Sequence, residues 1–119
     1  MFKKKKKMNI NFEEIKKDPQ IELAFQLIYT QRKEKEGLII LEELEKNGNK
    51  NALYLLSYMY YTEKIALDNK KIIEYFIKLT KYKEIFACYN LGVFYRDGKR
   101  VERDFGKAIQ YFELGEYKN

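Results

Sequence analysis

Carboxylates, lysines and tyrosines are numerous in this chain, but none stands in the pattern of a known active site. The 119 residues include no histidine and a single cysteine, Cys88. Without histidine, Ser-His and Cys-His nucleophile pairs and most zinc and iron sites are excluded. The phosphate-binding patterns G-x-x-x-x-G-K-[ST] and G-x-G-x-x-G do not occur. We therefore expect a protein without catalytic, cofactor-binding or metal-binding residues, and not an enzyme.

Carboxylates are the most abundant groups that could act as general acids or bases. They fall beside lysines on the expected polar faces of helices, in the groups Glu13 and Glu14, Glu34 and Glu36, and Glu42, Glu43 and Glu45. Side chains in such positions are usually solvated and form ion pairs along the helix. A general acid–base pair is the alternative interpretation, and we favour the solvated face.

Cys88 is the remaining candidate nucleophile. By sequence spacing its nearby cations are Lys81, Lys83 and Arg96, and a cation next to a thiol can make it reactive. A cysteine within an apolar helical segment is more often a small buried residue, and this is our prediction, with a redox or nucleophilic role as the alternative. One cysteine cannot form an intrachain disulfide, which favours a reducing compartment, and we expect a cytoplasmic protein.

A row of tyrosines gives the clearest indication of a function. The spacing i, i+4, i+7 places three tyrosines on one face of a helix, and a later segment has Tyr, Val and Arg at the matching positions. Tyr and Arg often dominate the energetics of protein interfaces. The alternative is that these side chains cover the edges of a hydrophobic groove. The predicted partner-binding residues are Tyr54, Tyr58, Tyr61, Tyr89, Val93 and Arg96.

The net charge of +6 comes almost entirely from the N-terminus. Lysines occupy positions 3–7, so the chain from Met8 onward carries about +1. We interpret residues 1–10 as a basic, disordered tail, and Met8 offers a second possible start. A polyanion-binding arm is the alternative, but the balanced charge elsewhere disfavours nucleic acid as a partner. No apolar segment follows the lysines or is long enough to cross a bilayer, so we expect neither a signal peptide nor a membrane span.

The elements that would position these residues are helices. With one proline and six glycines, the chain has little material for a turn-rich β fold. Asn11 three residues before Glu14, and Asp18 directly before Pro19, have the pattern of helix starts. Asn47 and Gly48 have the pattern of a helix end. Between them, the apolar residues of positions 21–28 nearly surround the helix axis, which predicts burial on more than one side.

Internal repeats indicate how the helices are arranged. A shift of 35 residues aligns positions 52–60 with 87–95, with Ala, Leu and Tyr at the same four-residue steps. A shift of 36 aligns Asp68, Lys71, Ile73, Tyr75 and Phe76 with Asp104, Lys107, Ile109, Tyr111 and Phe112. An earlier hairpin fits this rhythm less closely. Helical hairpins of this period predict an all-α solenoid, because each hairpin buries its apolar face against its neighbours. We place about three hairpins at 19–47, 50–80 and 83–115, within a single domain of residues 11–119.

The third hairpin resembles the Sel-one-like repeat (SLR) family of the tetratricopeptide-like superfamily, whose pattern runs roughly A-x-x-x-L-G-x-x-Y-x-x-G-x-G-V-x-x-D-x-x-K-A-x-x-Y-[FY]. The residues that match are Ala87, Leu91, Gly92, Tyr95, Gly98, Val101, Asp104, Lys107, Ala108, Tyr111 and Phe112. The second hairpin keeps Ala52, Leu56, Tyr60, Asp68, Lys71, Tyr75 and Phe76. Arg100 stands where the family has a second loop glycine, so a positive φ there would be strained.

The resemblance implies a right-handed superhelix whose concave face is lined by the first helix of each pair. It also implies an adaptor or scaffold that binds a peptide or a folded protein. A toxin-neutralising or effector-partner protein is an alternative. A secreted, disulfide-rich branch of the family has lactamase-like activity, and it pairs the cysteine at the position of Cys88 with another eight residues earlier. This chain has Thr80 there, so the resemblance does not extend to that activity.

Overall fold

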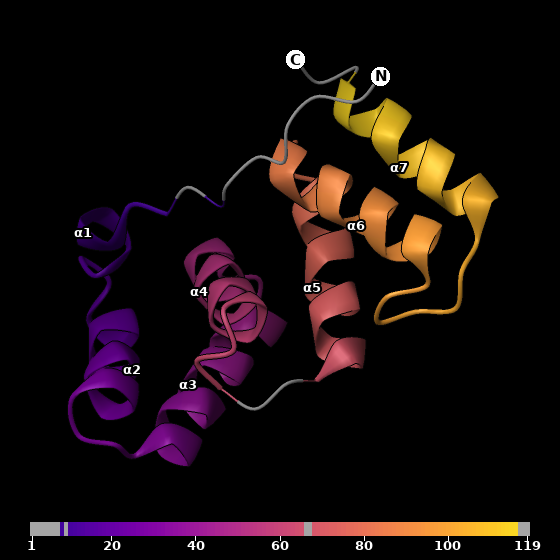
Figure 1. Ribbon diagram of the computed structural model, residues 1–119. Helices are drawn as coiled ribbons and strands as arrows, with labels where there is room; N and C mark the ends of the chain where they lie inside the picture. Colours follow the sequence, from indigo (N-terminus) through magenta and orange to yellow (C-terminus); the bar gives the residue numbers. More distant parts are fainter. Residues whose placement is uncertain (1–7, 9, 66–67, 117–119) are drawn as a thin grey trace. The chain divides into compact units, whose positions relative to one another are not determined.

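The computed structural model describes residues 8, 10–65 and 68–116, and within them it consists of helices and loops without a β-strand (Figure 1). Positions 1–7 and 9 of the predicted basic tail lie outside the described residues. The helices are α1 (Phe12–Ile15), α2 (Pro19–Tyr29), α3 (Glu34–Lys46), α4 (Lys50–Tyr61), α5 (Asn69–Thr80), α6 (Ile85–Asp97) and α7 (Phe105–Glu116). The all-α fold expected from the sequence is confirmed.

Side-chain caps fix the starts of α1 and α2 as the sequence predicts. The Asn11 side chain accepts a hydrogen bond from the Glu14 backbone N–H at 3.1 Å. Asp18 accepts one from the Gln20 N–H at 2.9 Å, with Pro19 as the first helical residue. Each cap satisfies a donor that the helix itself leaves without a partner. The end of α3 is also as predicted, because Gly48 follows it with a φ of 88°.

The chain divides into two compact parts, which we describe separately. The first, within residues 9–66, contains α1 to α4, and the second, within residues 67–119, contains α5 to α7. The predicted hairpins 19–47, 50–80 and 83–115 enclose the pairs α2 and α3, α4 and α5, and α6 and α7. The assignment of residues 11–119 to a single domain stays a prediction.

In the first part, α3 packs against both α2 and α4. Ile21, Leu41 and Leu56 are completely buried there. Gly37 lets α3 approach α2, because a Cβ atom at this position would lie 2.9 Å from the carbonyl oxygen of Ala24. Leu23 corrects the expectation of burial around α2, because its side chain is 51% exposed and the helices of the first part do not cover it.

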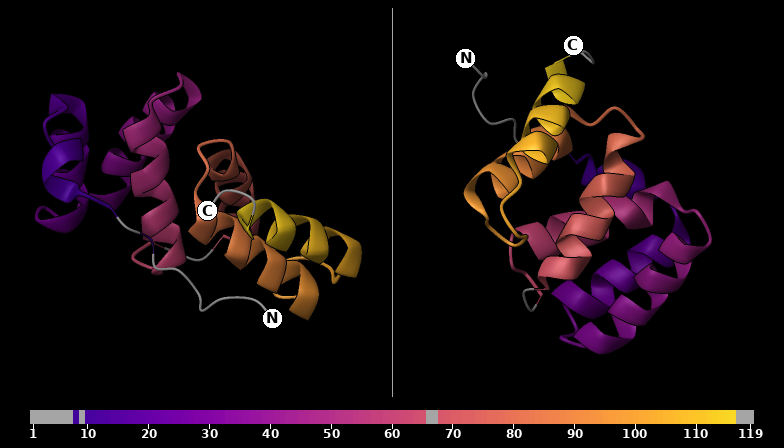
Figure 2. Two further views of the ribbon diagram at one scale, coloured as in Figure 1. Left: turned by 90° about the horizontal axis from the view of Figure 1, so that it is seen from above. Right: turned by 90° about the vertical axis from the view of Figure 1, so that its right-hand side faces the viewer.

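In the second part, α6 packs against α5 and α7, and the further views show α6 and α7 side by side (Figure 2). Phe76 of α5 contacts Phe86 edge-on, with ring centroids 5.0 Å apart, and stacks on Phe94 at 6.0 Å. Leu91 and Cys88 are fully buried. The predicted burial of Cys88 is therefore confirmed.

The loop between α6 and α7 combines one expected and one strained conformation. Gly98 ends α6 with a φ of 66°, a left-handed conformation that glycine adopts without strain. Arg100 also has a positive φ of 70°, which is unfavourable for a residue with a Cβ atom. Its guanidinium donates a hydrogen bond to Asn69 Oδ1 at 3.2 Å and lies 5.3 Å from the Phe94 ring centroid. These contacts act against the strain, whereas the Nε of Arg100 is buried without a hydrogen-bond partner.

Candidate partner-binding site

The predicted tyrosine row of α4 lies on a partly exposed face of that helix. Tyr54, Tyr58 and Tyr61 are each half-buried, whereas their neighbours Leu55 and Leu56 are completely buried. The period of the helix explains this difference, because positions i, i+4 and i+7 share the edge of the buried face. The Lys50 ammonium lies 5.7 Å from the Tyr54 ring centroid. The row is thus placed where a partner could reach its rings.

Tyr58 also belongs to an aromatic cluster formed by Phe12, Phe25, Tyr29 and Tyr58. The Phe12 ring contacts Tyr58 edge-on at 5.2 Å and Phe25 at 6.0 Å, and Phe25 stacks on Tyr29 at 4.4 Å. Burial raises the pKa of the Tyr29 hydroxyl to about 12, and the neighbouring Tyr58 adds to this rise. These contacts support the packing interpretation for Tyr58.

Two lysines lie over the rings of this cluster. The Lys16 ammonium is 4.6 Å from the Phe25 centroid, and the Lys64 ammonium is 4.7 Å from the Tyr29 centroid. Both distances fall within the range of cation–π contacts. Sequence reasoning missed the cluster, although the i, i+4 spacing of Phe25 and Tyr29 was a usable signal. No pattern in the sequence predicted that the two lysines lie over these rings.

The row of α6 is more rigidly held. Tyr89 and Val93 are half-buried, and Arg96 is exposed. The Tyr89 ring contacts Phe112 edge-on at 5.7 Å, and the Arg96 guanidinium carbon lies 6.0 Å from the same Phe112 ring centroid. A phenylalanine of α7 therefore fixes both ends of the α6 row.

Asp97 fixes the guanidinium of Arg96 further. Arg96 Nε donates to Asp97 Oδ1 at 2.8 Å, and a second guanidinium nitrogen donates to Oδ2 at 3.2 Å. This hydrogen bonding raises the pKa of Arg96 and lowers the pKa of Asp97. The paired geometry orients the planar guanidinium, so Arg96 presents its remaining donors in a defined direction.

The two rows lie in different compact parts, one on α4 and the other on α6. Within each row the structure brings the three predicted side chains to one helix face. That the six residues form one continuous, concave surface stays a prediction. Among the described residues there is no group of three or more His, Cys, Asp or Glu side chains that could hold a metal ion. No helix in the described ranges has the length and apolar character needed to cross a membrane.

The comparison with protein families decides which family of helical repeats this is. The Sel1 repeat matches residues 50–78 and 85–116, about half of the chain. The chain belongs to the Sel1 repeat family. No curated protein and no solved structure matches it. The matched segments of this Sel1 repeat protein cover α4 with most of α5, and then α6 with α7. The assignment of residues 19–47 as a further repeat stays a prediction.

Sel1 repeats generally mediate protein–protein interaction and are typically non-catalytic. In the second matched Sel1 repeat, the interior residues Ala87, Leu91 and Gly92 of α6 are completely or nearly completely buried, as the resemblance implied. Tyr89, Val93 and Arg96 alternate with the buried residues along α6, on the part of the helix that is not covered by the core. The repeat thus separates residues that build the fold from residues that remain accessible.

Proposed function

We propose that this Sel1 repeat protein is a non-catalytic adaptor that binds a peptide or protein partner through the side-chain rows of α4 and α6. The observation that carries the proposal is the arrangement of the α6 row. Tyr89 and Arg96 are accessible and yet are both held against Phe112. Residue types that dominate interface energetics therefore stand preformed on the surface of this chain.

Preorganisation is the physical reason why such a row favours binding. A partner that contacts a mobile side chain must restrict its rotamers, which costs about 0.5–1.5 kcal/mol for each long side chain. Phe112 and Asp97 already restrict Tyr89 and Arg96 within the unbound protein. A guanidinium has five N–H donors, so Arg96 retains donors for a partner while it is paired with Asp97.

The α4 row contributes in a different way. Tyr58 packs against Phe12, so its loss is expected to affect stability as well as binding. We propose that its exposed edge forms a second contact surface, together with Tyr54 and Tyr61. The α6 row is therefore the better place for a test that separates binding from folding.

Site-specific crosslinking tests this proposal. Tyr89→p-benzoylphenylalanine keeps an aromatic ring on α6, and Gln110→p-benzoylphenylalanine on the exposed side of α7 is the matched control. We expect irradiation in a lysate of the native cells to yield a discrete adduct from position 89 and none from position 110. An excess of unlabelled wild-type protein should abolish the adduct, and mass spectrometry should identify the partner.

Affinity measurements with the purified partner complete the test. Tyr89→Ala and Arg96→Ala are each expected to weaken binding at least about 5-fold, which corresponds to about 1 kcal/mol. Their thermal melts should remain cooperative. Equal adducts at positions 89 and 110, or unchanged affinity in both variants, would refute the proposal that the α6 row binds the partner.

A further inference from the structure

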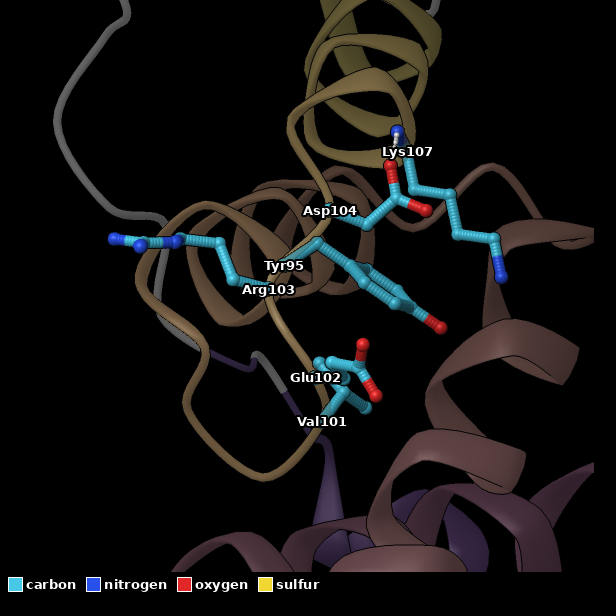
Figure 3. Close-up of a pocket in the computed structure, with 6 residues that line it drawn as sticks. All are labelled: Tyr95, Val101, Glu102, Arg103, Asp104 and Lys107. Carbon is cyan, nitrogen blue, oxygen red and sulfur yellow. Dashed lines mark hydrogen bonds between the residues drawn. The ribbon is translucent and has the colours of Figure 1, made fainter.

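The loop between α6 and α7, together with the first turn of α7, forms an open pocket of about 390 Å³ (Figure 3). None of its lining residues belongs to the row of Tyr89, Val93 and Arg96. The pocket can therefore be tested independently of the proposed function. Its lining residues are Tyr95, Val101, Glu102, Arg103, Asp104 and Lys107.

Tyr95 places a polar group in this pocket. The residue is only 8% exposed, and its ring stacks on Tyr111 with centroids 5.8 Å apart. Its hydroxyl points away from the helix into the pocket (Figure 3). No group among the described residues hydrogen-bonds to this hydroxyl, which opens onto the pocket although the rest of the residue is buried. The hydroxyl is therefore positioned to donate to a ligand oxygen.

Lys107 brings a positive charge to the same side of the pocket. Its ammonium nitrogen lies 5.3 Å from the Tyr95 ring centroid, and in Figure 3 it extends in the same direction as the Tyr95 hydroxyl. The backbone N–H of Lys107 donates to Asp104 Oδ1 at 3.0 Å, which caps α7. Within the described part of the chain the side-chain ammonium has no carboxylate partner. It can thus pair with an anion without breaking an existing ion pair.

The remaining charges of the pocket limit the anion to a small one of low charge. The pocket lies beside the first turn of α7, and the N-terminus of a helix favours negative charge. The backbone there is open at Gly106, because a Cβ atom at this position would meet only Asp104 Oδ1, at 3.4 Å. The carboxylate of Glu102 faces the pocket below the Tyr95 ring, whereas Arg103 points away from that ring (Figure 3). The carboxylates of Glu102 and Asp104 oppose any anion, and this repulsion is twice as large for a phosphate dianion as for a monoanion, so the contacts of Tyr95 and Lys107 can outweigh it only for a monoanion.

We propose that this pocket binds a carboxylate group. One carboxylate oxygen accepts a hydrogen bond from the Tyr95 hydroxyl, and the other pairs with the Lys107 ammonium. Val101 supplies an apolar wall for the carbon atoms that carry the group. A pocket of 390 Å³ holds one residue of a peptide rather than a long segment. The carboxylate comes from an acidic side chain or from a chain end, and the experiment separates these two sources.

Three small probes distinguish carboxylate recognition from plain burial of a side chain. N-acetylvaline carries a chain-end carboxylate, N-acetylglutamic acid α-amide carries a side-chain carboxylate, and N-acetylvalinamide carries none. Each is titrated into the full-length ¹⁵N-labelled protein while the amide signals of Gly106 and Lys107 are followed by NMR. We expect at least one of the carboxylate probes, and not the neutral amide, to shift these signals in a saturable manner.

Conservative variants then test the two assigned contacts. Tyr95→Phe removes only the hydroxyl, and Lys107→Gln removes the charge but keeps the backbone N–H that Asp104 caps. Each substitution is expected to lower the affinity for the carboxylate probe about 5-fold, as for the loss of one hydrogen bond or ion pair. Glu102→Gln removes a repulsive charge and is expected to raise the affinity for the same probe about 2-fold. Lys70→Gln, on the exposed side of α5, is the charge-matched control and should leave the affinity unchanged.

The outcome is decided by comparing these titrations. Binding of N-acetylvaline alone assigns the pocket to a chain end, and binding of N-acetylglutamic acid α-amide alone assigns it to an acidic side chain. Three outcomes would overturn the proposal. They are equal shifts with N-acetylvalinamide, no shift with either carboxylate probe, and unchanged affinity in both Tyr95→Phe and Lys107→Gln. Circular dichroism of each variant confirms that a loss of binding does not reflect unfolding.

Discussion

The ring of Phe112 lies directly against the backbone of Gly92. A Cβ atom at Gly92 would come within 2.6 Å of the Phe112 ring atoms Cδ1 and Cε1, a separation shorter than any ordinary carbon contact. The same Phe112 ring contacts Tyr89 and Arg96. The missing side chain of Gly92 therefore lets α7 approach α6 closely enough to support the candidate binding row.

Gly92→Ala is expected to destabilise the protein by about 1–3 kcal/mol, the usual range for overpacking a core. The reason is that the added methyl group must displace the Phe112 ring. The free energy of unfolding in urea measures this effect. Gly106→Ala is the matched control, because its Cβ would have room beside Asp104. That control should be neutral or stabilising by up to about 1 kcal/mol. Similar losses in both variants would contradict the close contact.

Leu91→Ala is expected to cost about 2–5 kcal/mol of unfolding free energy, as for other truncations of fully buried leucines. Leu91 is 0% exposed, whereas Leu114 on α7 is 37% exposed. Leu114→Ala is therefore the control and should cost clearly less. Thermal melts of both variants check the difference. If Leu114→Ala lowered the stability as much as Leu91→Ala, the assignment of Leu91 to the core and of Leu114 to the surface would be contradicted.

The stability of the first part is expected to fall at high pH because of Tyr29. The pKa of Tyr29 is raised from 10.0 to about 12, mainly by burial. The folded protein thus holds the phenol proton more tightly than the unfolded chain does. Its contribution is complete below pH 10 and is lost as the pH rises towards about 12. Wild-type stability should therefore fall relative to that of Tyr29→Phe across this window.

Urea unfolding at several pH values from 9 upward measures this difference. Tyr58→Phe serves as the comparison, because Tyr58 is the smaller of the two causes of the shift. It should retain most of the wild-type pH dependence. A constant difference between wild type and Tyr29→Phe over the whole range would contradict the raised pKa.

Cys88 is expected to be protected from thiol reagents in the folded protein. Its side chain is completely buried in α6, so reaction requires local or global opening. An aromatic disulfide reagent should modify native Cys88 at least about 100-fold more slowly than the urea-unfolded chain. The control is an exposed cysteine, Glu113→Cys, in a Cys88→Ala background, which should react rapidly in the native protein. Cys88→Ala itself should change stability by about 1 kcal/mol or less.

The parts of the fold that depend on local sequence could be predicted. Asn11, Asp18 and Asp104 each cap a helix through a backbone N–H two or three residues later, so the whole interaction lies within one short segment. Gly98 is predictable for the same reason, since the left-handed conformation is a property of the residue itself. The repeat period also indicated the pairs α2 with α3 and α6 with α7, which pack against each other in the fold.

Contacts between distant segments had no comparable signal. The edge-on contact of Phe12 with Tyr58 depends on how α1 and α4 meet, and no short-range pattern specifies that meeting. Arg100 illustrates the same limit: the sequence indicated strain in its loop, but only the fold reveals Asn69 and Phe94 as its compensation. The tyrosine rows were predictable as helix faces, while the pocket at Tyr95 depends on the path of a loop.

The boundary between the two compact parts has a consequence for anyone who shortens or recombines this protein. The first matched repeat, residues 50–78, begins with α4 and continues into α5. In the fold, however, α4 packs against α3 within residues 9–66, whereas α5 packs against α6 within residues 67–119. A fragment cut at the sequence repeat would expose the apolar faces of both neighbours. For grafting or shuffling, a cut between residues 66 and 67 keeps the contacts of α3 with α4 and of α5 with α6 intact.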